Sequence, residues 1–246
     1  MYNLLIAIGI SIVLFIVGSL VTGTLVAGFI PGSIGLAVTY VILARRSGKK
    51  LQALMTRAGK EFQSGRLDTG RKILKEGLAF RKWQFLVDAQ IHAQLGSLDY
   101  LQRRYKDARV HLEKAEVLSS ALGRQWIPQA MLATIDFREK KHADALQRIG
   151  KLKKAGGKDS CFWGLYAYLA MESGDKERAL SILADAAKKL PDSNSIQGMT
   201  TSIQNRKKVK MKAFAPTWYQ FFPEQMPRKM GQQQQRPGHS YPQPRR

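Results

Sequence analysis

The sequence predicts an all-α protein in which a transmembrane helical hairpin precedes an α-solenoid of about four helix pairs, a capping helix and a disordered basic tail. Three observations carry this prediction. Residues 4–44 contain no charged side chain and no histidine. After Lys50, apolar residues recur at helical spacing, and glycine and aspartate interrupt them regularly. The predicted parts are a membrane anchor (1–50), a helical repeat domain with its capping helix (51–212) and a basic, aromatic- and Pro/Gln-rich tail (213–246).

The apolar N-terminal stretch is too long for one membrane span. As a single helix, its 41 residues would measure about 60 Å, against a hydrocarbon core of about 30 Å. Two spans of about 20 residues fit this length. Breakers that could make the turn lie at residues 22–24 and at residues 28–32. Both positions stay open at this point.

The charges beside the anchor predict its orientation. Arg45, Arg46, Lys49 and Lys50 follow the apolar stretch directly, and an excess of Lys and Arg marks the cytoplasmic side of a span. The alternative is a cleaved signal peptide, which requires a basic start that Met-Tyr-Asn lacks. We therefore expect an integral protein of the bacterial inner membrane, with the repeat domain in the cytoplasm.

Composition limits the chemistry of the chain. A formal net charge of +22 favours anionic partners such as lipid headgroups, nucleic acid or acidic protein surfaces. Cys161 is the only cysteine, which excludes a disulfide framework and the usual Cys-based zinc sites. The four histidines have no metal-ligand spacing, and no nucleophile motif, phosphate loop or catalytic carboxylate pair is present. We expect no catalytic residues, no metal and no cofactor.

The clearest internal unit covers residues 160–191. It has an aromatic residue, a small residue, a glycine corner, two alanines and a final proline, at Trp163, Ala167, Gly174, Ala179, Ala186 and Pro191. This spacing resembles the tetratricopeptide repeat. The alanines let two helices cross closely, glycine makes the corner and proline stops the second helix.

The same register recurs upstream. Residues 89–122 form a second good unit, which includes Gly96, Ala108 and Ala115. Two weaker units lie around Ala145 and Gly70, and a helical bundle without repeat geometry is the alternative for the first of the four. The equivalent positions at Gly70, Ala108, Ala145 and Ala179 are spaced by 38, 37 and 34 residues, which predicts an irregular array. A helix after Pro191 is expected to cap it.

The resemblance implies a binding groove on the concave face formed by the first helix of each unit. One recurring position there holds Phe62, Tyr100, Phe137 and Met171, and Tyr168 lies beside it. These residues are candidates for binding an apolar peptide or helix. Packing between the repeats is the alternative role. The Lys and Asn residues of the chaperone-tail carboxylate clamp are absent.

The tail combines charge with aromatic rings. Basic residues including Lys207, Lys208, Lys210 and Lys212 precede the cluster Trp218, Tyr219, Phe221 and Phe222. Such a cluster is expected to dock on the groove, the membrane interface or a partner, and its basic neighbours favour an anionic leaflet slightly over the groove. From about residue 231 the chain is expected to be disordered.

Together these features predict a non-enzymatic, membrane-anchored scaffold that binds a protein partner through its repeat groove. The alternative is a membrane-tethered nucleic-acid or ribosome binder that uses the basic surface and tail. Nucleic acid is the less favoured partner because no RNA-binding motif accompanies the basic stretch. Salt dependence separates the two, since counterion release makes a nucleic-acid complex weaken steeply with salt.

Overall fold

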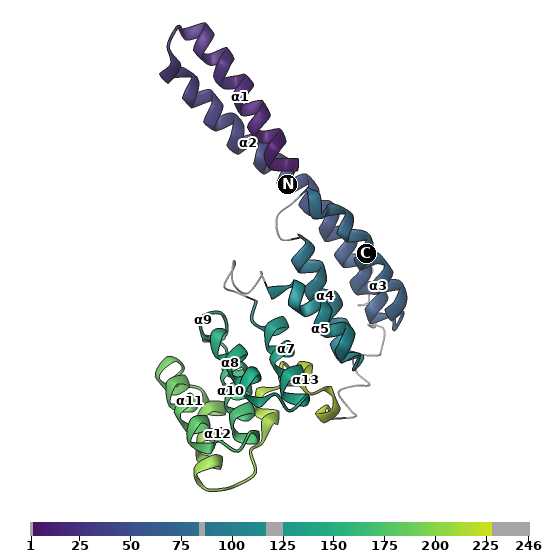
Figure 1. Cartoon of the computed structure of the whole chain (residues 1–246), viewed down its shortest axis with the longest axis vertical. Coiled ribbons are helices and arrows are strands. Elements are labelled where there is room, and N and C mark those ends of the chain that lie inside the picture. The colour runs from purple at the N-terminus through teal and green to yellow at the C-terminus, as the bar shows by residue number, and fades with distance from the viewer. Residues whose placement is uncertain (1, 84–86, 117–124, 228–246) are drawn as a thin grey trace, which may run out of the picture. The chain divides into compact units, whose positions relative to one another are not determined.

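The computed structural model describes residues 2–83, 87–116 and 125–227, which form helices joined by short turns, with no strand among them (Figure 1). The predicted all-α class is confirmed. Contacts divide the chain into two compact units between Ile91 and His92, and not at the predicted boundary after Lys50. The predicted end of the second repeat at residue 122 and the disorder predicted from residue 231 lie outside the described residues.

The first unit begins with two antiparallel helices, α1 (Tyr2–Thr22) and α2 (Leu25–Gln63), which pack along each other (Figure 1). Gly23, with φ of +70°, makes the turn between them, so the first of the two predicted turn positions is correct. The other lies inside α2. The outward side chains of the hairpin are apolar and exposed; Val21 is 80% exposed and Val26 is 79% exposed. Both helices are apolar and long enough to cross a membrane.

Small residues let α1 and α2 approach closely. A Cβ atom on Gly28 would lie 2.5 Å from the carbonyl oxygen of Phe15. One turn later, Ser11 Oγ donates a hydrogen bond to the carbonyl of Gly32 (2.8 Å). Glycine at these positions therefore permits direct contact between the backbones, as is common where helices associate in membranes.

The helix α2 is continuous for 39 residues, and Pro31 lies within it. The boundary predicted after Lys50 thus falls inside a helix, because the change from apolar to basic residues near Arg45 does not break the backbone. The C-terminal part of α2 packs on α3 (Leu67–Glu76), which leads into the 3₁₀ helix η1 (Gly77–Lys82).

The second unit contains helix pairs followed by a single helix. The helices are α4 (Val87–Leu101), which begins in the first unit, α5 (Tyr105–Lys114), α7 (Ile127–Arg138), α8 (His142–Lys151), the short α9 (Lys153–Gly156), α10 (Ser160–Glu172), α11 (Lys176–Lys189) and α12 (Asn194–Gln204). The last of these buries Ile196, Met199 and Ile203 against α10 and α11. This is the apolar face expected of the predicted capping helix.

The corners that join the paired helices share one local geometry. A residue with left-handed backbone sits at each, with φ of +76° at Gly65, +60° at Arg103, +63° at Lys140 and +88° at Gly174. Its N–H bonds to the carbonyl three residues earlier, and the next N–H bonds to the carbonyl five residues before itself. This is the Schellman arrangement of a helix C-terminus. The corners recur after 38, 37 and 34 residues, the intervals read from the sequence.

The two acidic residues that are buried in the described part of the chain, Asp99 and Asp136, sit at equivalent places near these corners. Asp99 forms an ion pair with Arg104 (3.0 Å) across the first corner of the second unit. Asp136 lies between Arg109 on α5 (2.7 Å) and Arg148 on α8 (2.8 Å). Because a buried carboxylate is costly without partners, Asp136 holds three consecutive helices in one arrangement.

Candidate partner-binding site

The C-terminal segment of the second unit lies on the helices instead of extending away from them. It consists of η2 (Met211–Phe214), α13 (Trp218–Phe221) and η3 (Pro223–Gln225). The four clustered rings of Trp218, Tyr219, Phe221 and Phe222 are buried and belong to the same apolar core as α7 and α10. We call residues 211–226 the aromatic segment.

The aromatic segment contacts the first helix of successive pairs. Tyr168 on α10 meets the ring of Trp218 edge to face, with 5.0 Å between centroids. Trp126, just before α7, stacks on Phe221 at 5.6 Å. Tyr100 on α4 donates its hydroxyl proton to the carbonyl of Phe221 (2.6 Å). Burial raises the pKa of the Tyr100 phenol, so the hydroxyl keeps its proton and remains a donor at neutral pH.

Gly164 on α10 provides a seat for one further ring. A Cβ atom at Gly164 would lie 2.7 Å from ring atoms of Phe214, which is shorter than any ordinary carbon contact. Phe214 itself is buried. The absence of a side chain at Gly164 is therefore what allows the aromatic segment to lie flat on α10.

Arg138 at the end of α7 fixes the far end of the segment. Its guanidinium pairs with Glu224 (2.6 Å) and lies over the ring of Phe222 (5.2 Å). Both contacts use the same side chain, and part of it is buried, which strengthens charge–charge and cation–π attraction relative to an open surface. Nothing in the residue pattern around Arg138 distinguishes it from the many other basic residues.

These contacts decide among the three destinations expected for the aromatic residues. They dock, as predicted, but on the face of the first helices. The slight preference for the membrane interface differs from the described structure, in which the four rings are buried in the apolar core of the second unit. The predicted domain boundary after Lys212 does not separate two bodies, since the core continues from Ile203 through Met211 to Phe222.

The five residues predicted to line the groove have different surroundings. Phe62 packs on Gly70 of its own helix pair, where a Cβ atom would meet the ring. Tyr100 is covered by the aromatic segment. Phe137 is half-buried and contacts His142 across its corner. Met171 and neighbouring Tyr168 line an open pocket. Phe62 and Phe137 thus pack within their own helix pairs, and the predicted alternative, packing between the repeats, stays a prediction.

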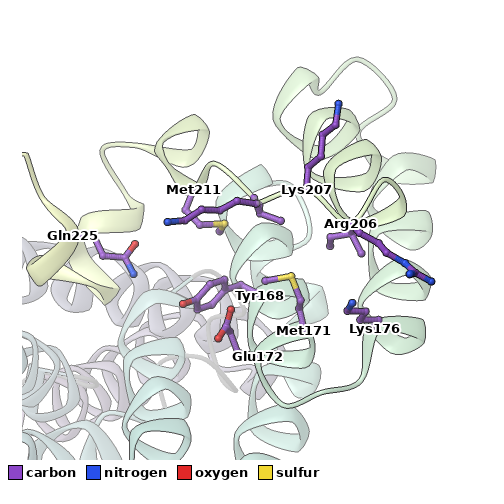
Figure 2. Close-up of a pocket in the computed structure, with 11 residues that line it drawn as sticks. Tyr168, Met171, Glu172, Lys176, Arg206, Lys207, Met211 and Gln225 are labelled. Atoms are coloured by element: carbon purple, nitrogen blue, oxygen red, sulfur yellow. The ribbon is translucent and has the colours of Figure 1, made fainter.

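That pocket has a volume of about 730 Å³ and lies between α10, the end of α12 and the aromatic segment (Figure 2). Tyr168, Met171 and Glu172 project into it from α10, and Gln225 and Met211 come from the aromatic segment (Figure 2). Its basic residues are Lys176, Arg206, Lys207 and Lys208. We call this site the α10 pocket.

The electrostatics of the α10 pocket are unbalanced. Its four basic side chains are exposed, Glu172 is the single acidic residue that lines it, and within the described residues none of the four lies within ion-pairing distance of a carboxylate. Burial raises the pKa of the Tyr168 phenol, and the Glu172 carboxylate acts in the same direction. The pocket therefore offers four cations, a neutral phenol and the apolar side chain of Met171.

The basic residues predicted for the tail divide into two sets. Lys207 and Lys208 line the α10 pocket, whereas Lys210 and Lys212 are exposed outside it. Lys176 and Arg206 join the first set, although sequence spacing alone gives no reason to place them there. They meet because α12 ends beside the start of α11.

The signature residues of the predicted repeats are structural. Gly96 faces Leu112 with no room for a side chain, and the small residues Ala108, Ala115, Ala167, Ala179 and Ala186 are buried with Trp163. Pro191 follows the end of α11 at Lys189. Cys161 is buried in α10, and burial raises the pKa of its thiol to about 12.

No group of three His, Cys, Asp or Glu residues that could hold a metal ion occurs in the part of the chain that the structure describes. Compared with protein-family models, curated proteins and solved structures, the chain gives no match.

Proposed function

We propose that this chain is a non-enzymatic adaptor. Helix α1 and the apolar half of α2 anchor it in a membrane, and an array of tetratricopeptide-like helix pairs lies in the cytoplasm. The array binds an acidic segment of a protein partner in the α10 pocket. The observation that carries the proposal is the pocket itself: four cations and an apolar floor remain open beside α10, while the adjoining face is covered by the chain's own aromatic segment.

Two features support the repeat architecture. The recurrent corner geometry and its spacing are what a series of homologous helix pairs would produce. The buried alanines at the helix crossings have the same explanation. Membrane anchoring is supported by the exposed apolar surface of the hairpin. In water this surface would be exposed at a cost in free energy, whereas lipid tails would cover it.

The chemistry of the pocket supports an acidic partner segment. Cations without internal partners favour a segment rich in Asp and Glu, and Met171 offers a flexible apolar contact for one side chain of that segment. The expected ligand is thus an acidic stretch with an apolar residue within it. The orientation given by Arg45 and Arg46 puts this pocket on the cytoplasmic side.

Site-specific crosslinking in native membranes tests the proposal. A photoreactive amino acid replaces Met171 in one variant and Lys188, exposed on α11 outside the pocket, in a control. We expect a discrete protein adduct at position 171 and none at 188. Two charge reversals refine the test: Lys207→Glu with Lys208→Glu should abolish the adduct, whereas Lys210→Glu with Lys212→Glu should leave it.

The same experiment separates the rival function. A nucleic-acid binder would respond to both charge reversals similarly, would crosslink to RNA or DNA, and would lose binding steeply with added salt. Equal adducts at positions 171 and 188, or equal loss in both double variants, would contradict partner binding in the α10 pocket.

A further inference from the structure

A second cavity lies in the first unit, where the hairpin emerges from its apolar section. It has a volume of about 380 Å³ and is lined by Asn3, Leu43, Arg46, Ser47, Lys50, Phe80 and Trp83. Residues from three elements meet there: the start of α1, the middle of α2 and the end of η1. None of the described residues that line it is acidic.

The cavity lies at a defined depth. The uncharged stretch of the chain ends at Ala44, so Leu43 belongs to the apolar span and Arg46 is the second charged residue beyond it. Tyr2 packs edge to face on Trp83, with 5.4 Å between ring centroids, and Trp83 is 43% exposed. Tyrosine and tryptophan flanked by basic residues are typical of the interface between lipid tails and water.

The polar groups of the cavity are arranged around its basic residues. Arg46 and Lys50 are four residues apart and so share one face of α2. Neither has a carboxylate within ion-pairing distance among the described residues. Asn3, 3% exposed, donates to Ser47 Oγ (2.9 Å) and ties the start of α1 to α2 beside them. Arg46 and Lys50 therefore line the cavity without a described carboxylate to neutralise their charge.

The wider surroundings carry the same sign. Residues 45–83 contain 12 Lys and Arg against 3 Asp and Glu, a surplus that attracts anions to this end of the hairpin. A ligand that suits the cavity must place an anionic group on Arg46 and Lys50 while an apolar part rests against Leu43 and Phe80. A phospholipid with a net negative headgroup has both parts in this order.

We infer that the cavity is a binding site for one anionic phospholipid of the cytoplasmic leaflet, with the phosphate on Arg46 and Lys50 and the proximal acyl chain along Leu43. The inference rests on the membrane anchoring in the proposed function and adds a specific lipid contact to it. The sequence predicts a lipid contact near the lysines that precede the aromatic segment. The proposed site lies instead at the base of the hairpin.

Lipid titration of the full chain tests the site. The protein is purified in neutral detergent, and native mass spectrometry counts bound phosphatidylglycerol and phosphatidylcholine. We expect one phosphatidylglycerol to bind in preference to phosphatidylcholine. Arg46→Gln with Lys50→Gln should raise the phosphatidylglycerol concentration for half-occupancy about tenfold or more, as expected from the loss of a charge-assisted contact. Arg46→Lys with Lys50→Arg should bind as the unmodified chain does.

The chain offers a matched control. Arg45 and Lys49 have the same residue types and spacing at nearly the same depth, and they are exposed but do not line the cavity. Arg45→Gln with Lys49→Gln should leave binding unchanged. Equal weakening in both double variants, or displacement of the lipid by inorganic phosphate alone, would overturn the lipid site.

Carbonate extraction of membranes keeps the two proposals distinguishable. Release of the chain by carbonate would contradict membrane anchoring and the lipid site with it. A chain that stays in the membrane while both pairs of variants bind lipid alike would overturn the lipid site and leave the adaptor proposal standing.

Discussion

Single side chains decide how the aromatic segment lies on the helices. Gly164 leaves room for Phe214, and Tyr100 supplies a buried donor to the Phe221 carbonyl. Each contact joins residues more than 45 positions apart. Sequence periodicity can place Gly164 on the groove side of its helix, but it cannot reveal which distant ring occupies the space above it.

Gly164→Ala should destabilise the second unit by about 1–3 kcal/mol, because the new methyl group overlaps the Phe214 ring and forces it from its seat. Gly198 on α12 is the control, since nothing lies within 4 Å of a Cβ atom there. Gly198→Ala should stabilise α12 by up to about 1 kcal/mol through helix propensity alone. Urea unfolding in detergent measures both changes. Equal free energies of unfolding for the two variants would contradict the close contact between Gly164 and Phe214.

Cys161 should resist alkylation in the folded chain. Burial raises the pKa of its thiol to about 12, and only the thiolate reacts. The thiol has a higher pKa in the folded chain than in the unfolded chain. Raising the pH above the ordinary thiol pKa therefore lowers the stability of the fold, while the thiol of the folded chain stays protonated. Iodoacetamide labelling at pH 8 should be slow without urea and fast with it. Rapid labelling of the native chain would contradict this expectation.

At the scale of helices, the recurring corners are features that local sequence can specify. A corner needs a left-handed residue and a small residue five positions later, as at Gly174 and Ala179. Both requirements are local and leave a signature. Arg103 and Lys140 adopt the same left-handed backbone without glycine, so their corners were visible only through the spacing of the alanines. The aromatic segment depends on contacts distant in sequence, and its destination left no such signature.

Overpacking a helix crossing should cost stability. Ala179 and Ala186 on α11 are fully buried, and Lys188 on the same helix is exposed. We expect Ala179→Leu and Ala186→Leu each to destabilise the second unit by about 1–3 kcal/mol, since added methylene groups push neighbours off their rotamers. Lys188→Leu should stay within about 0.5 kcal/mol. Thermal melts of the three variants in detergent provide the comparison, and three equal melting temperatures would count against a close crossing.

For the whole molecule, the sequence indicates a membrane section and a helical section but not where they join. The uncharged stretch and its basic flank are compositional features, so they are visible in the residue list. The continuity of α2 through Lys50 is different. Residues on both sides of the change from apolar to basic composition favour helix. The sequence therefore does not indicate whether the helix continues or ends between them.

Reporter fusions test the orientation of the hairpin. A fusion after Ser64, just beyond α2, should place a fluorescent protein in the cytoplasm, because Arg45 and the following basic residues hold that end inside. An alkaline phosphatase fused at the same site should stay inactive. The phosphatase is active only after export. Its activity would therefore contradict the proposed cytoplasmic position of the helix pairs and of the α10 pocket.

Because α2 is uninterrupted, the apolar stretch joins the rest of the first unit through continuous helix and not through a flexible linker. Leu51 and Ala58, which α2 buries in the first unit, lie on the same continuous helix as Leu43 in the apolar stretch. One residue inserted after Gly48 would turn them by about 100° relative to that span. A flexible linker would absorb such an insertion without effect. In the proposed membrane-anchored state, any rotation or tilt of α2 would be transmitted to α3, which packs on the C-terminal part of α2.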